Sequence, residues 1–334
     1  MSAQSFSRRR LLQTTGLAAA AVAAPSIVRA QSYPSRPITM IVPFNTGGYN
    51  DRLARAFAPF LQEAIGQPVT VENRPGAGSL LGHTYFLQQP ADGYTILCTS
   101  AAPYIPLNVL IQDAPFAVED FHMINLPSRD YTMAATAADS EIESIEQVFE
   151  GLKADPTAYT IGIQPQSADL VNLTVTCQEL GIDTSALRMV TYDGGGPTRN
   201  AAAGGVVDVS FVGGQGFLPL REQIRPLMVY TEERASDWPD TTSYAEFAAA
   251  QGIAARHVAG SQRGFVVQSR FVEEEPARYA TLLAAIEAAS KSPDTVEALT
   301  NAQLATRWYG PDASNAALRS TAETMAQFVD LLRG

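Results

Sequence analysis

A strand–turn–helix unit near the start of the chain decides its fold: residues 38–65 read ITMIVPFNTGGYNDRLARAFAPFLQEAI. The run 38–42 is almost continuously apolar, which is typical of a strand that is covered on both faces. After a turn over residues 43–48, apolar residues recur at the spacing of one helix face, at Leu53, Phe57, Phe60, Leu61 and Ile65. Pro59 lies inside this helix and is expected to kink or split it, and Gly66 is expected to end it.

The same alternation continues along the chain and predicts an α/β protein with mainly parallel sheets. Further strands are expected over residues 69–72, 94–98, 159–163, 187–191, 207–211 and 227–230. Helices are expected over residues 79–89, 168–180, 197–203, 276–290, 293–302 and 313–333. Strand–helix–strand connections imply parallel pairing with right-handed crossovers.

The length and the two similar series of elements indicate two lobes, because about 300 residues exceed one ordinary domain. No low-complexity linker separates the series, so we expect strand connections near residues 126–135 and 225–232. The expected lobes are residues 31–130 together with 231–334, and residues 131–230.

Residues 1–30 resemble a twin-arginine (Tat) signal peptide. Arg8 and Arg9 precede two leucines and an alanine-rich apolar run, and small residues lead to Ala30. We expect cleavage near Ala30 and a mature protein outside the cytoplasm, in the periplasm. The alternative is a mildly basic N-terminus without a targeting role.

The charge of the chain argues against nucleic acid and anionic lipid as partners. Without residues 1–30, 19 basic and 34 acidic side chains remain, a net charge of −15 against −11 for the whole chain. Nucleic-acid and lipid-surface binding both favour a basic face. No run after residue 30 is long enough to span a membrane.

Few residues in the chain suggest catalysis or metal binding. The histidines His83, His122 and His257 are isolated, and neither a P-loop nor a G-x-S-x-G motif occurs, so we expect no metal, no cofactor and no enzyme activity. The glycines at 76–82 have the wrong spacing for a dinucleotide site. Cys98 and Cys177 could form a disulfide, but two separate buried thiols fit their contexts better.

The turns that follow the strands are the candidate ligand sites, since ligands of open parallel sheets bind outside the carboxyl ends of the strands. The first turn contains Phe44, Asn45, Thr46, Gly47, Gly48 and Tyr49 and leads into a helix whose free N–H groups could bind a carboxylate. Asp51 could cap that helix or accept a hydrogen bond from a ligand. The alternative is a capping turn that binds nothing.

Two turns in the second series of strands and helices correspond in position to the first turn. One contains Tyr192, Asp193, Gly194, Gly195 and Thr198, and the other contains Gln164, Gln166 and Ser167. Both lie between a strand and a helix start, where backbone and amide groups could reach a ligand. The alternative for the glycine-rich turn is a flexible surface connection.

The chain resembles the extracytoplasmic solute receptors of tripartite tricarboxylate transporters, also called Bug receptors. The resemblance is dense over residues 33–98 and includes Pro43-Phe44, Gly47-Gly48 with Asp51, the run 71–78, and Asp92-Gly93-Tyr94-Thr95. It weakens afterwards but remains visible at Tyr192, Gly194, Pro197, Gly204-Gly205 and Asp208.

The resemblance implies a two-lobe periplasmic binding protein of the type II kind, a monomer that closes over a small organic carboxylate and delivers it to membrane permease subunits. It implies that the ligand lies between the first turn and the turn 192–198, with Ser100, Ala101 and the turn 164–167 completing the site. The chain departs from the family at Tyr49, at Asp193, where a lysine is usual, and at Gln164–Gln166. These departures suggest a larger or aromatic ligand, or one with an amine that pairs with Asp51 or Asp193; Arg256 or Arg263 could reach a carboxylate.

Two other functions stay open at this point. An exported enzyme would fit the folded-export signal, although the chain offers no catalytic constellation. A ligand-sensing subunit of a membrane signalling partner would use the same closure of two lobes.

Overall fold

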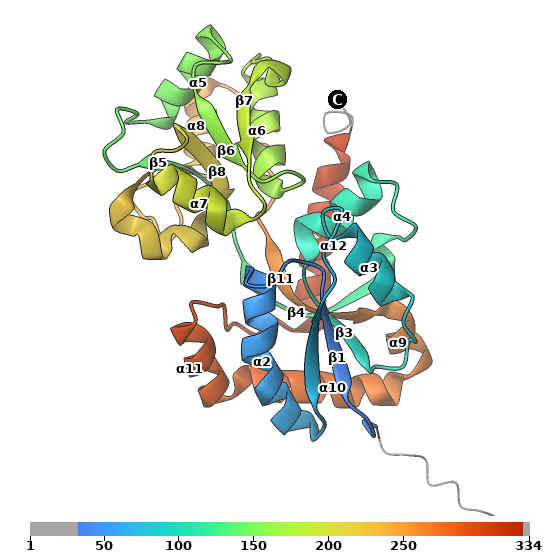
Figure 1. The fold of residues 1–334 in the computed structure, drawn as a ribbon. Coiled ribbons are helices and arrows are strands. Elements are labelled where there is room, and N and C mark those ends of the chain that lie inside the picture. Colours follow the sequence, from blue (N-terminus) through green and yellow to red (C-terminus); the bar gives the residue numbers. More distant parts are fainter. Residues whose placement is uncertain (1–32, 330–334) are drawn as a thin grey trace, which may run out of the picture.

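The computed structural model describes residues 33–329, so the expected signal peptide and its cleavage site near Ala30 lie outside the described residues. Figure 1 shows two lobes, each a sheet with helices on its faces. The α/β architecture expected from the strand–helix alternation is confirmed.

The first lobe is built on a five-stranded sheet with the order β2-β1-β3-β11-β4. Its strands are β1 (Ile38–Val42), β2 (Val69–Asn73), β3 (Thr95–Ser100), β4 (Phe121–Arg129) and β11 (Gln262–Gln268). β1 pairs in parallel with β2 and β3, as the crossovers predict, whereas β11 is antiparallel to both of its neighbours.

Helices cover both faces of this sheet. One face packs against α2 (Tyr49–Ile65), α10 (Pro276–Lys291) and α11 (Pro293–Asn301), and the other against α3 (Leu80–Leu87), α4 (Ala101–Ile111) and α12 (Gly310–Ala326). Two short elements, η1 (Val118–Asp120) and α9 (Ser269–Glu274), flank strands of the sheet. Gly66 ends α2 in the left-handed conformation, at φ 71°, as expected, but Pro59 does not split this helix.

The second lobe is built on a six-stranded sheet with the order β10-β9-β5-β8-β6-β7. Its strands are β5 (Thr132–Ala137), β6 (Thr160–Ile163), β7 (Arg188–Thr191), β8 (Val209–Gly213), β9 (Ile224–Val229) and β10 (Thr242–Ser243). One face carries α5 (Ile145–Ala154), α6 (Ala168–Glu179) and α8 (Tyr244–Gln251), and the other carries α7 (Gly195–Ala203) and η3 (Gly214–Gln223). A further short helix, η2 (Thr184–Ala186), precedes β7.

Between residues 33 and 329 the chain passes from one lobe to the other twice. The first passage joins β4 to β5 over residues 129–132, within the expected span. The second passage differs from the expected one near 225–232, because β9 pairs with β10 inside the second sheet and Tyr244 stacks on Tyr230 in the second core. The chain returns to the first lobe only after α8, over residues 252–261, so residues 231–251 belong with the second lobe.

An apolar cluster joins the lobes beside these passages. Leu107 of α4 and Met325 of α12 pack with Ala168, Val171 and Val175 of α6, and Val258 of the second passage completes the contact. Figure 1 shows α4 and α12 alongside the lobe that carries α6. The side of the molecule that carries this cluster is therefore held together by buried apolar surface as well as by the chain itself.

The two cysteines lie in different lobes, Cys98 in β3 and Cys177 in α6. Both are buried and free. The expectation of two separate buried thiols is confirmed.

Candidate functional site between the lobes

The first turn and the glycine-rich turn of the second lobe face each other and touch. Asn45 Nδ2 donates a hydrogen bond to Asp193 Oδ2 at 3.1 Å, although 148 residues separate the two in sequence. A second contact joins the lobes where Gln166 lies directly against Gly78. Figure 1 shows the N-terminal end of α2 directed toward the lobe that carries α7. The structure thus brings together turns that follow β1 and β7, which lie in different sheets.

Asp51 holds the first turn in shape. Its Oδ2 accepts the N–H of Gly47 at 2.8 Å, and its Oδ1 accepts Arg55 Nε at 2.9 Å and Asn73 Nδ2 at 3.0 Å. Burial alone would raise the pKa of this carboxyl, but these hydrogen bonds and the Arg55 charge lower it below its usual value. Both oxygens accept hydrogen bonds from the first lobe, so Asp51 shapes the turn.

We expect Asp51→Ala to lower the free energy of unfolding by about 1–3 kcal/mol, because it removes three hydrogen bonds to a buried carboxylate. Urea unfolding followed by circular dichroism measures the change. Glu63→Ala, an exposed carboxylate on the same helix, is the control. Equal stability of the two variants would contradict this role for Asp51.

The start of α2 offers hydrogen-bond donors at the junction of the lobes. Gly48 caps the helix without a side chain, so the N–H groups of Tyr49, Asn50 and Asp51 have no acceptor within the helix. Asn50 is buried and donates to Ser100 Oγ at 2.9 Å, while its Oδ1 has no partner among the described residues. This helix start can therefore bind an anion through its backbone.

Tyr49 is anchored to other parts of the first lobe. Its hydroxyl accepts the N–H of Ala305 at 2.9 Å, and the guanidinium of Arg263 lies 4.7 Å from the centre of its ring. Phe44 packs edge-to-face on Tyr104 of α4, with 5.1 Å between ring centres. The ring of Tyr49 is thus already paired with a cation, and Tyr104 is an aromatic neighbour of the turn that the sequence analysis missed.

The glycine-rich turn of the second lobe exposes backbone but buries Thr198. Gly194 adopts φ 120°, which favours glycine, and leads into α7, where Gly195 and Gly196 have no acceptor within the helix. Thr198 is fully buried and donates to the carbonyl of Gly194 at 3.0 Å, and Tyr192 packs against the core of its own lobe. Thr198 therefore fixes the turn, while Asp193 contacts the first lobe through Asn45.

The remaining predicted residues lie near the start of α6 and at the end of β3. Ser167 caps α6, accepting the N–H of Leu170 at 3.1 Å and donating to the carbonyl of Gln164 at 2.7 Å. Ser100 and Ala101 are buried at the end of β3. Gln166 is exposed at φ 51° and makes the contact with Gly78.

Several charged residues converge on the same junction, and of these the sequence analysis named only Arg263. Arg263 Nη1 donates to Asp130 Oδ2 and to Ser128 Oγ, both at 3.2 Å. The charges of Asp130, Arg263, Asp169 and Arg52 all act on Arg199 of α7. Arg256, the other predicted arginine, pairs instead with Glu179 on the outside of α6.

Asp169 carries a carboxyl with an unusual pKa. It is 5% exposed at the start of α6 and accepts Thr132 Oγ1 at 2.7 Å. Burial, reinforced by the nearby Asp130 charge, raises its pKa to about 7 against the partial compensation of the Thr132 hydrogen bond. Its position two residues after the Ser167 cap was the signal that could have identified it.

We expect Asn45→Ala and Asp193→Ala each to weaken ligand affinity by about 3- to 10-fold, because the hydrogen bond between them exists only when the lobes touch and is worth about 1 kcal/mol. In a double-mutant cycle measured by calorimetry, the double variant should lose no more than either single variant. Asn200→Ala, exposed on α7, is the control. Losses that simply add would show that the pair does not act in closure.

Residues 33–329 lack the features of a metal site and of a membrane-spanning helix. Within that range, no three His, Cys, Asp or Glu side chains gather as a metal site would need. None of the described helices is both long and apolar enough to cross a membrane.

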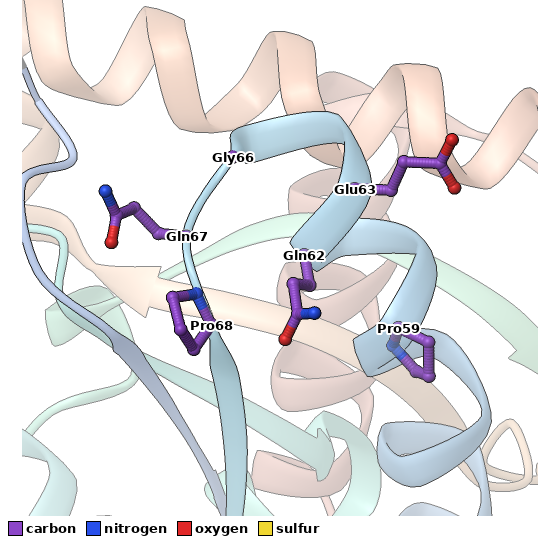
Figure 2. A pocket seen from close by; sticks show the side chains of 6 residues that line it. All are labelled: Pro59, Gln62, Glu63, Gly66, Gln67 and Pro68. Atoms are coloured by element: carbon purple, nitrogen blue, oxygen red, sulfur yellow. The ribbon is translucent and has the colours of Figure 1, made fainter.

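A shallow hollow of about 510 Å³ lies at the opposite end of α2 and is lined by Pro59, Gln62, Glu63, Gly66, Gln67 and Pro68 (Figure 2). Five of these six residues are exposed, and no arginine or lysine lines it. It also lies at the carbonyl end of the helix, which disfavours anions. The junction of the lobes is therefore the better candidate site.

Comparison with known proteins agrees with this architecture. Residues 53–330 match the profile of the tripartite tricarboxylate transporter family receptor. Protein BugT of Bordetella pertussis is 32% identical over 244 residues, which are 71% of this chain and 73% of that protein.

Two solved structures from Rhodopseudomonas palustris share the fold. MatC with bound malate has a TM-score of 0.72 at 21% identity and covers 90% of this chain and all of its own. Rpa4515 with adipate has a TM-score of 0.72 at 21% identity and covers 90% of this chain and 98% of its own. The two-lobe fold of the binding proteins is confirmed, and the chain is a solute receptor rather than an enzyme: it belongs to the tripartite tricarboxylate transporter receptor family, the family that includes BugT.

Proposed function

We propose that this receptor captures a small organic carboxylate between its lobes and delivers it to the membrane permease of a tripartite transporter. The observation that carries the proposal is the meeting of two glycine-bearing helix starts, one from each lobe, joined by the Asn45–Asp193 hydrogen bond. Malate and adipate occupy the structures of two proteins of this fold, which supports a carboxylate as the class of ligand.

Local donors provide the affinity, because the protein as a whole is acidic and its overall field repels anions. The free N–H groups of α2 and the positive end of its dipole favour one carboxylate from the first lobe. The start of α7 presents Gly195 and Gly196 from the second lobe. A ligand that touches both helix starts stabilises the closed arrangement over the open one.

Closure uses the two chain passages as a hinge. Residues 129–132 and 252–261 are the connections along which the lobes can rotate, and the apolar cluster of α4, α6 and α12 lies beside them. The contacts Asn45–Asp193 and Gly78–Gln166 form when the lobes meet. The permease would recognise the closed form.

We further propose that the protein works as a monomer in the periplasm. The twin-arginine signal over residues 1–30, with cleavage near Ala30, would export it already folded. Family membership supports a periplasmic location.

Calorimetry on the purified mature protein tests the function. Malate, succinate, adipate, butyrate, hexanoate and the uncharged 1,6-hexanediol form the panel, after removal of co-purified ligand by partial unfolding and dialysis. Mass spectrometry of the freshly purified protein identifies any acid that it carries. We expect at least one carboxylate to bind with micromolar or tighter affinity and to be recovered unaltered, whereas binding of none of them would contradict the proposal.

A further inference from the structure

Arg199 is a charged side chain at the junction of the lobes that lacks a carboxylate partner. It lies on α7 and is partly buried, yet no acidic group of the described residues comes within ion-pair distance. Its one hydrogen bond within residues 33–329 joins Nη1 to the carbonyl of Gly213 at 3.2 Å. A guanidinium has five N–H donors, so most of its bonding capacity stays unused in an environment that penalises unpaired charge.

Two glycines make room for this guanidinium. A Cβ at Gly195 would lie 2.8 Å from Arg199 Nη1, and a Cβ at Gly216 would collide with the guanidinium carbon. Neither glycine has a positive φ, so the backbone does not demand glycine at these places. Space for the side chain, and not turn geometry, explains these two glycines.

The electrostatic neighbours of Arg199 come from both lobes. Asp130 and Asp169 favour its charged form, while Arg263 of β11 and Arg52 of α2 oppose it. Asp130 is already paired with Arg263 at 3.2 Å, and Asp193 accepts a hydrogen bond from Asn45. The acidic groups are thus largely satisfied, and the cluster retains positive charge that an anion would neutralise.

We propose that Arg199 binds the second carboxylate of the ligand, and that it makes this receptor selective for molecules with an anionic group at each end. The inference rests on the proposed function. One carboxylate binds the start of α2 in the first lobe, and the other forms paired hydrogen bonds with Arg199 in the second lobe. A ligand with two anionic ends therefore bridges the lobes, and a ligand with one leaves the guanidinium unpaired.

The test compares dicarboxylates with monocarboxylates of the same chain length. Calorimetry measures the affinities of succinate, adipate, butyrate and hexanoate for the wild type and for Arg199→Gln, Arg199→Lys and Lys153→Gln. Lys153 is exposed on α5 of the same lobe, so its variant controls for the change in net charge. Thermal unfolding without ligand verifies that each variant is folded.

We expect the wild type to bind the better dicarboxylate at least tenfold more tightly than its monocarboxylate. Arg199→Gln should weaken the dicarboxylate at least thirtyfold and the monocarboxylate less than threefold. Arg199→Lys keeps the charge but loses the paired geometry, so it should weaken the dicarboxylate about tenfold. Lys153→Gln should change neither affinity.

The outcomes separate the two claims. If the wild type binds carboxylates but a folded Arg199→Gln retains dicarboxylate affinity, or loses both affinities equally, the role of Arg199 is wrong and the carboxylate receptor stands. Should Arg199→Gln fail to fold, the lysine variant decides in the same way. If the wild type binds neither these four acids nor malate, the proposed function and this inference both fail.

Discussion

Replacing Gly48 with aspartate is expected to weaken carboxylate binding at least a hundredfold while leaving the fold intact. Gly48 caps α2 with φ −69° and ψ 171°, an extended conformation that any residue adopts. A Cβ there would meet only the carbonyl of Asn45, at 3.4 Å. An aspartate at this position caps the helix well, so its carboxylate takes the N–H groups that the ligand needs and repels the ligand's charge.

Gly48→Asn is the matched control, because it has the same shape and caps the same helix without the charge. We expect both variants to unfold at or above the wild-type temperature, and the asparagine variant to lose less affinity than the aspartate variant. Calorimetry with the tightest-binding acid of the panel measures the difference. Wild-type affinity in the aspartate variant would show that the first turn does not hold the ligand.

The Asp169→Asn variant is expected to exceed the wild type in free energy of unfolding by an amount that grows with pH and reaches up to about 4 kcal/mol above pH 7. Burial raises the pKa of Asp169 to about 7, so the folded protein holds this proton more tightly than the unfolded chain. The free energy of unfolding of the wild type should therefore fall as the pH rises from about 4 to about 7. In this range the carboxyl is ionised in the unfolded chain but still protonated in the folded protein. Asparagine preserves the hydrogen bond from Thr132 and removes the titration.

Urea unfolding of both proteins at pH 5, 6, 7 and 8 measures this dependence. Comparing the variant with the wild type cancels other titrating groups, among them His83, whose pKa burial lowers to about 4. Asp139→Asn, exposed in the same lobe, is the control and should show no trend. A constant difference between Asp169→Asn and the wild type across this range would contradict the buried ionisation.

The periodic part of the fold could be predicted from the sequence, and the long-range part could not. The strands β1, β2 and β3 follow from local apolar runs, and their parallel order follows from the helices between them. β11 enters the same sheet from about 160 residues later and runs antiparallel, which no local pattern specifies. The two-residue β10 is too short for any periodicity, and without it the second passage was expected at 225–232 instead of 252–261.

The parts of the candidate site that consist of backbone groups could be predicted from the sequence. The parts that consist of side chains from distant segments were mostly missed. Glycines after strands identify turns, so residues 44–49 and 192–196 could be named. The orientation of Asp51 into its own turn depends on Asn73, and the ion pair of Arg263 with Asp130 joins two segments that lie far apart in the chain. These contacts arise from tertiary packing and leave no spacing signal in the chain.

A crystal structure of the mature protein with its tightest-binding carboxylate tests the central claim most directly. The account predicts one carboxylate within hydrogen-bond distance of the N–H groups of Tyr49 and Asn50, and the rest of the molecule directed at α7 of the opposite lobe. A ligand that contacts neither turn, for example one seated in the hollow beside Gly66, would contradict it.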